Sequence, residues 1–149
     1  MYSPFIQFIQ YRFQTIKKLN PCIVVEIGSG SGVVSVFLQQ MLIGCCDEDS
    51  DSPPPNVVFS LCTDLNPNAC RTTKRTASLN FNDDQMSARH LNLDAVNCDL
   101  LDAMRERLAG KIDVLVFNPP YVPTSEHEAD EAKTGTDPLV SHFIWNKRL

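Results

Sequence analysis

The side chains best suited to chemistry stand in one short motif, Asn118-Pro119-Pro120-Tyr121, which follows the apolar run Val114–Phe117. An amide or exocyclic amine nitrogen has a delocalised lone pair and is a poor nucleophile. The Asn118 side-chain oxygen and the Pro119 carbonyl can accept both of its hydrogens and hold it in line with a methyl donor. Pro119 and Pro120 stiffen the loop, and Tyr121 offers a flat face to a planar group. The motif therefore predicts methyl transfer to a planar nitrogen. The alternative, a proline turn after a buried strand, leaves Asn118 and Tyr121 unexplained.

A glycine-rich stretch, Gly28-Ser29-Gly30-Ser31-Gly32, follows an earlier apolar run over 22–27. Glycine permits a tight turn and lets the backbone approach a ligand closely. A dinucleotide fingerprint would place its third glycine at position 33, which is Val33. This offset favours S-adenosylmethionine over a nicotinamide cofactor. A tight turn that needs glycine only for its own geometry is the alternative interpretation.

Two aspartates follow the next two strand-like runs. Asp64 can accept both hydroxyls of a ribose with its two carboxylate oxygens, or it can act as a helix N-cap, a role that Asn66 could also fill before Pro67. Asp99 can accept from the amino group of adenine, with a surface helix cap as the alternative. We predict that both bind the cofactor, because both follow the strands of one series.

Apolar runs of strand type alternate with runs of helical spacing along the chain. After an opening helix that Asn20-Pro21 ends, strands are predicted over 22–27, 57–63, 93–98 and 112–117, and helices over 33–41, 67–79 and 101–108. Such alternation predicts right-handed βαβ units, and hence a Rossmann-like α/β fold with a parallel sheet and helices on both faces. Ligands of these sheets bind at the carboxyl ends of the strands, where Gly28, Asp64, Asp99 and Asn118 all fall.

The length of 149 residues predicts a single domain. Within it, 44–56 has the acidic and proline-rich composition of a solvated loop, and 125–149 is a tail without the pattern of further strands. No apolar run approaches the roughly 20 residues that span a bilayer, so we expect no transmembrane or signal segment.

Charge and cysteine usage narrow the function classes. A net charge of −5 argues against broad nucleic-acid contact, which needs clustered Lys and Arg. No C-x-x-C pair or zinc ligand set is present, so we expect reduced thiols, in a cytoplasmic or nuclear protein. Three of the six cysteines, Cys22, Cys62 and Cys98, are expected inside buried strands. The histidines are expected at the surface; they are His90, His127 and His142.

Three stretches together resemble the eukaryotic HemK-type methyltransferase family: EIGSGSGVVS at 26–35, CTDLNP at 62–67 and VFNPPYVP at 116–123. The resemblance implies a class I methyltransferase fold and glutamine N5 methylation in the Gly-Gly-Gln loop of a translation termination factor, with residues 118–121 as the catalytic motif. It also implies a set of S-adenosylmethionine contacts: Glu26, Gly28, Asp64, Asp99, Leu100 and Asn118.

The family resemblance further implies lysine methylation of a histone and a heterodimer with a small zinc-binding activator subunit. The chain departs from the family in two respects: residues 1–20 contain no Pro-x-Glu-Asp-Thr/Ser stretch, and only four of seven strands are apparent. We therefore expect a chain truncated at both ends, with an exposed sheet edge that favours aggregation. Two alternatives stay open. One is an adenine or cytosine amino-methyltransferase of nucleic acids, and the other is a non-catalytic fragment that binds only the cofactor or the partner.

Overall fold

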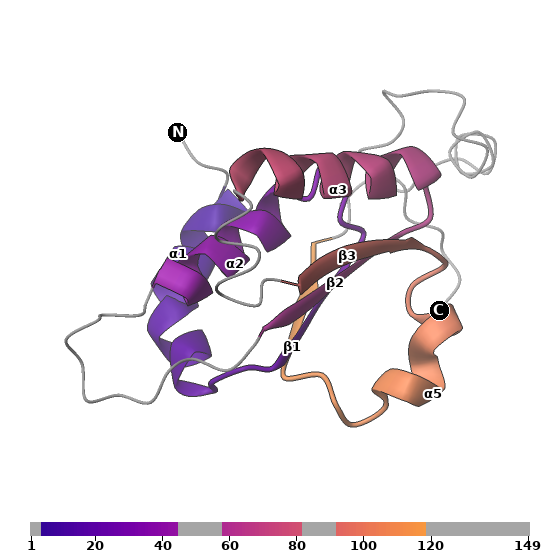
Figure 1. Cartoon of the computed structure of the whole chain (residues 1–149). Coiled ribbons are helices and arrows are strands. Elements are labelled where there is room, and N and C mark those ends of the chain that lie inside the picture. Colours follow the sequence, from indigo (N-terminus) through magenta and orange to yellow (C-terminus); the bar gives the residue numbers. More distant parts are fainter. Residues whose placement is uncertain (1–3, 45–57, 82–91, 119–149) are drawn as a thin grey trace.

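The computed structural model of the chain describes residues 4–44, 58–81 and 92–118 (Figure 1). Most of the predicted loop over 44–56, the motif residues 119–121 and the tail over 125–149 lie outside these ranges. The helices are α1 (Pro4–Lys18), α2 (Val33–Gly44), α3 (Pro67–Asn80) and the short α5 (Arg105–Leu108), preceded by a 3-10 turn, η1 (Asp102–Met104). The strands are β1 (Ile23–Ile27), β2 (Phe59–Asp64), β3 (Asn92–Asn97) and β4 (Val114–Phe117).

The four strands form one parallel sheet in the order β3-β2-β1-β4. Ile27 at the end of β1 pairs with Thr63 of β2 and with Phe117 of β4, so these strands end at the same edge. The chain moves outward from β1 to β3 and then crosses back to β4 on the other side of β1. This confirms the predicted parallel α/β sheet and places the turn after β1 next to the point where the strand order reverses.

One face of the sheet is covered by α1, α2 and α3. Val24 and Val116 pack with Ile9 and Phe13 of α1 and with α2 side chains in the largest apolar cluster. Further along the same face, Cys62 and Ala95 pack against Cys70 of α3. Side chains alternate along a strand, and the register aligns these inward positions across the sheet.

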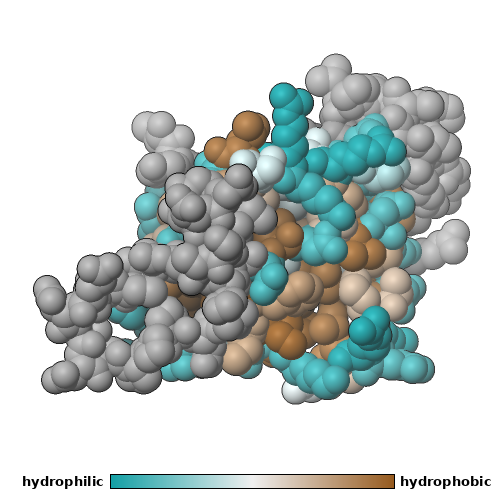
Figure 2. Space-filling model, in the orientation of Figure 1, coloured by the Kyte–Doolittle hydropathy of each residue, from teal (hydrophilic) through white to brown (hydrophobic). Residues whose placement is uncertain are grey.

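The opposite face carries the short helix of the β3–β4 crossover. In Figure 1 α5 lies on the side of the sheet away from α3, which confirms helices on both faces. Three large apolar side chains of this face are partly exposed: Phe59, Leu115 and Phe117. Figure 2 shows hydrophobic side chains at the centre of the view, between the hydrophilic surfaces of α3 and α5.

Two details of the sequence prediction were wrong. The helix predicted over 101–108 is divided, because Met104 has φ −130° and ψ 3° and so interrupts the helical backbone between η1 and α5. Cys22 and Cys98 lie outside the strands, with Cys22 exposed and Cys98 half-buried. The Cys22 N–H donates to the Asp113 carboxylate instead of to a neighbouring strand, and the chain turns sharply after Cys98, where Leu100 has φ 47°.

The opening helix ends where the sequence predicted. Asn20 adopts a left-handed conformation with φ 46°, and its N–H donates to the Lys17 carbonyl at 3.0 Å. Ile6, Ile9 and Phe13 form the buried stripe of this amphipathic helix. Across the described ranges, no helix combines the length and apolar character needed to cross a membrane.

Candidate functional site

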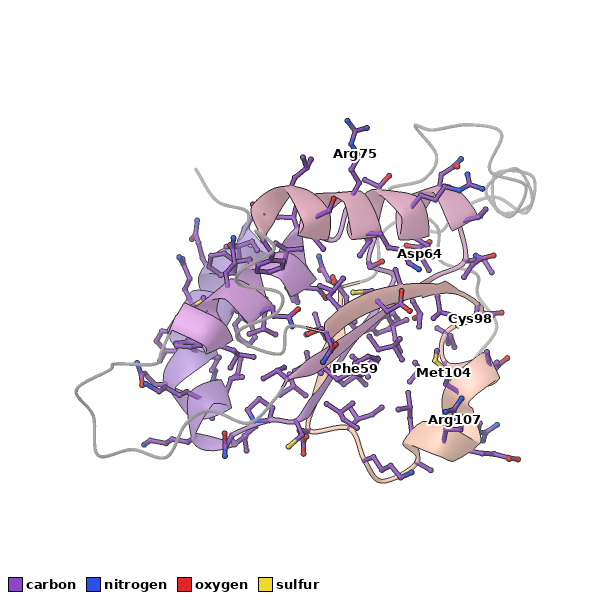
Figure 3. The ribbon with its side chains drawn as sticks, in the orientation of Figure 1. Phe59, Asp64, Arg75, Cys98, Met104 and Arg107 are labelled. Atoms are coloured by element: carbon purple, nitrogen blue, oxygen red, sulfur yellow. The ribbon has the colours of Figure 1, made fainter. Side chains whose placement is uncertain are left out.

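The predicted site residues gather at one edge of the sheet. Gly28 follows β1, Asp64 ends β2, Asp99 follows β3 and Asn118 follows β4. In Figure 3 Asp64 and Cys98 lie at this end, whereas Phe59, at the start of β2, lies at the other. The expectation that these four positions lie at the carboxyl ends of neighbouring strands is confirmed, whereas Pro119, Pro120 and Tyr121 lie outside the described residues, and the binding roles of all seven stay predictions.

The glycine turn is bound tightly to the end of β2. The N–H groups of Gly28 and Ser29 both donate to the Thr63 carbonyl, at 2.8 and 3.1 Å. Gly28 and Gly30 have positive φ, 72° and 53°, and among the described residues, apart from each glycine's own chain neighbours, no heavy atom lies within 4 Å of the place that a Cβ would occupy on either. The described residues therefore leave the backbone open at both glycines, which gives room for the close approach of a ligand; that a ligand binds there stays a prediction.

Gly32 is a glycine for a different reason. A Cβ on Gly32 would stand 2.8 Å from both Cα and Cγ2 of Thr73, closer than real Cβ contacts come. The missing side chain thus allows α3 to pack directly on the turn. The proposed contact of Gly32 with a cofactor stays a prediction, to which the structure adds this packing requirement.

Asp64 holds two segments of backbone together. Its Oδ2 accepts from the Gly30 N–H at 2.9 Å, and its Oδ1 accepts from the Asn66 N–H at 2.9 Å. Asn66 is the N-cap of α3, since its side chain accepts from the Asn68 N–H at 2.8 Å with Pro67 in the first turn. The cap therefore belongs to Asn66. The Asp64 side chain is partly exposed at this end of the sheet.

Glu26 is a buried carboxyl beneath the turn, with 3% of its surface exposed. Its Oε2 accepts from both the N–H (3.2 Å) and the hydroxyl of Ser35 at the start of α2. Burial raises the pKa of Glu26 to about 7, the Ser35 hydrogen bonds oppose this rise, and the charge of Asp64 adds to it. Glu26 can thus change protonation near neutral pH, directly below the predicted cofactor turn.

Asp99 and Leu100 form an unusual turn after β3. Leu100 adopts φ 47°, a left-handed conformation that costs a non-glycine residue roughly 1–2 kcal/mol. The Asp99 carbonyl accepts from the Asp102 N–H at 3.0 Å, and the Leu100 carbonyl lies 3.5 Å from the Cys98 thiol. The contact of Asp99 and Leu100 with a ligand stays a prediction.

Sequence reasoning missed two threonines of α3 that contact the turn. The Thr73 hydroxyl lies 3.0 Å from the Ser29 hydroxyl and 3.4 Å from the Gly30 carbonyl. The Thr76 hydroxyl donates to the Ser31 carbonyl at 2.7 Å. A spacing of three places both on one side of a helix, but only the packed structure shows that this side meets the glycines.

Burial makes the thiols of Cys62 and Cys70, near the site, poor nucleophiles. Burial raises the pKa of Cys62 to about 12 and that of Cys70 to about 11, so both are protonated at neutral pH. All four cysteines in the described ranges are free thiols. These ranges hold no cluster of three or more His, Cys, Asp or Glu side chains suited to a metal ion.

No protein-family model matches the chain, whereas several curated proteins do. Methyltransferase HEMK2 of mouse and that of human are each 39% identical over 106 residues, which are 71% of this chain and 40% of the relative. A putative protein N5-glutamine methyltransferase of Methanocaldococcus jannaschii is 33% identical over 82% of this chain and 52% of its own length. The eRF1 methyltransferase catalytic subunit mtq2 of Schizosaccharomyces pombe is 31% identical over 78% of this chain and 45% of its own length.

The parallel sheet, with a glycine turn after β1 and acidic residues at the ends of the next two strands, is a Rossmann-like class I methyltransferase fold. The chain spans about half, or less, of the length of the curated relatives that it matches. Within that fold class, the similarities place the chain in the HemK-type methyltransferase family.

Proposed function

We propose that this chain provides the cofactor-binding part, and Asn118 of the catalytic motif, of an S-adenosylmethionine-dependent protein methyltransferase that acts on the N5 atom of a glutamine side chain. One observation supports this above all others. Gly28, Asp64, Asp99 and Asn118 follow or end four neighbouring parallel strands and lie at one edge of the sheet. That edge is where a Rossmann-like sheet binds its ligand.

The described residues fit the cofactor chemically. The open backbone at Gly28 and Gly30 gives room for close approach. Asp64 would accept the ribose hydroxyls, and the exposed Asp99 would accept the adenine amino group. Glu26, below the turn, and Leu100, in its strained conformation, complete the proposed contacts.

The catalytic step needs positioning more than a strong base. When bound, S-adenosylmethionine supplies a methyl group on a positively charged sulfur. The Asn118 side-chain oxygen and the Pro119 carbonyl would accept the two amide hydrogens of the substrate and align its nitrogen, while Pro120 and Tyr121 would complete the motif as a stiff loop with an aromatic face. The acceptor nitrogen would take this methyl group from the sulfur and lose one proton to water.

The relatives' names support the substrate and the partner of this proposal. One relative is named for N5-glutamine methylation and another for methylation of eRF1. We propose as acceptor the glutamine of the Gly-Gly-Gln loop in a translation termination factor, with histone lysine as a further acceptor. The name of the fission yeast relative, a catalytic subunit, supports a heterodimer with a second subunit, for which we propose a small zinc-binding activator. The proposed compartment is the cytoplasm or the nucleus.

The test is transfer of labelled methyl from S-adenosylmethionine, measured for the chain alone and with the candidate activator. The acceptor is a termination factor, with its Gly-Gly-Gln glutamine intact or replaced by alanine, and oligonucleotides serve as competing acceptors. Label on the intact factor alone is the expected result, located by mass spectrometry at the glutamine. Label on adenine or cytosine would replace the proposal by a nucleic-acid methyltransferase, and cofactor binding without transfer would indicate a non-catalytic fragment.

A further inference from the structure

Helix α3 packs on the glycine turn through polar as well as close van der Waals contacts. Thr73 contacts Ser29 and Gly30 through its hydroxyl, and its Cα and Cγ2 occupy the space left by the missing side chain of Gly32. One helical turn further on, Thr76 donates to the Ser31 carbonyl at 2.7 Å. Thr73 is fully buried (0% exposed), and Thr76 is half-buried.

These hydrogen bonds fix the direction of the peptide groups in the turn. A peptide group is planar and trans, so its N–H points away from its carbonyl. With the Gly30 carbonyl held toward Thr73, the Ser31 N–H points to the opposite side. Thr76 holds the Ser31 carbonyl, so the direction of the peptide group between Ser31 and Gly32 is fixed in the same way.

The turn is thereby held from two sides. Thr63 and Asp64 of β2 bind the N–H groups of Gly28, Ser29 and Gly30. The threonines of α3 bind the carbonyls of Gly30 and Ser31. A turn with three glycines loses much conformational entropy when it becomes ordered. If the ligand had to order the turn on binding, this cost would reduce its affinity.

We propose that Thr73 and Thr76 are positioning residues that order the glycine turn before the cofactor binds. The inference rests on the proposed cofactor function of this turn. It assigns to α3, which neither the motifs nor the resemblance connects with binding, a direct part in setting cofactor affinity. The variant T76S should preserve the ordering of the turn, because serine retains the hydroxyl that donates to the Ser31 carbonyl.

The first measurement needs no cofactor. Amide hydrogen exchange of the turn residues, followed by NMR, is compared between the wild-type chain, T73V/T76V and the control T72V. Thr72 lies on the same helix but bonds its own backbone, donating to the Asn68 carbonyl at 2.9 Å. Loss of the hydrogen bonds of both threonines, each of typical strength, should accelerate exchange of Gly28, Ser29 and Gly32 by about fivefold to thirtyfold, with no change in T72V. Unchanged exchange in T73V/T76V would overturn the inference whatever the cofactor does.

The second measurement is the Kd for S-adenosylmethionine, determined by calorimetry well below the unfolding temperature of each variant. We expect T73V/T76V to bind between about fivefold and thirtyfold more weakly, T76S to bind almost as the wild type does, and T72V to be unaffected. Equal Kd values for the wild type and T73V/T76V would refute the positioning role alone. A wild-type chain that binds no S-adenosylmethionine would refute the proposed function and this inference together.

Discussion

Replacing Gly32 by alanine should destabilise the chain more than the same replacement at Gly28, although both glycines belong to one turn. Their backbones are almost alike, with φ 74° at Gly32 and 72° at Gly28. Alanine in this left-handed region costs roughly 1–2 kcal/mol at either position. Within the described part of the chain, only the Cβ added at Gly32 would also meet another residue, 2.8 Å from the Thr73 Cα.

The difference between the two variants isolates this collision. Overpacking a well-filled contact costs about 1–3 kcal/mol, and here the nearest atom is backbone, which cannot rotate away. We therefore expect G28A to lower the free energy of unfolding by about 1–2 kcal/mol and G32A to lower it by about 2–5 kcal/mol. For a chain of this size, each 1 kcal/mol lowers Tm by roughly 2–4 °C.

Urea denaturation followed by circular dichroism, without cofactor, measures both values. T73S in the G32A background provides an internal check, because serine removes Cγ2 but keeps Cα, and so should restore stability only in part. If G28A and G32A proved equally stable, the close packing of α3 on the turn would be wrong, and the cost would lie in backbone conformation alone.

Three further predictions follow from the site. Burial raises the pKa of Glu26 from 4.5 to about 7, so the stabilising contribution of the protonated carboxyl is complete below pH 4.5 and is lost as pH rises through about 7. The free energy of unfolding should fall by about 3 kcal/mol in order of magnitude over this range. In urea titrations between pH 5 and 8, E26Q should make the free energy of unfolding less dependent on pH. N118A should abolish methyl transfer while leaving much of the cofactor affinity, and equal loss of both would contradict its proposed role in holding the acceptor nitrogen. A thiol reagent should modify the exposed Cys22 at least tenfold faster than the buried Cys62, whose raised pKa also keeps it protonated; equal rates in the folded chain would contradict the burial of Cys62.

The sheet could be predicted from sequence because its signals are local. Short β-branched runs ended by Gly28, Asp64 and Asn118 mark the strands and their carboxyl ends, and parallel pairing brings those ends together without any knowledge of packing. The end of α1 shortly before Asn20 was likewise predicted from the residue types. The divided helix after Leu100 was not, since it depends on backbone angles that the apolar spacing does not determine.

The site was predicted less completely than the sheet. Asp64 and Asn66 were both possible helix caps, and only the hydrogen bonds of the folded chain assign the cap to Asn66. Thr73 and Thr76 look in the sequence like the polar face of an ordinary helix. Their contact with the turn depends on how α3 rotates about its axis when it packs on the sheet, which is a property of the whole core.

The double attachment of the glycine turn has a consequence for protein engineering. A designer who moves the stretch from Gly28 to Gly32 into another parallel sheet transfers the residue types but not the groups that bind them, which belong to β2 and α3. Without a partner like Asp64 on one side and a helix with hydroxyls in the places of Thr73 and Thr76 on the other, the grafted glycines would sample many conformations. The unit to transfer is therefore the whole segment from β1 through α3, of which the glycine motif is only one part.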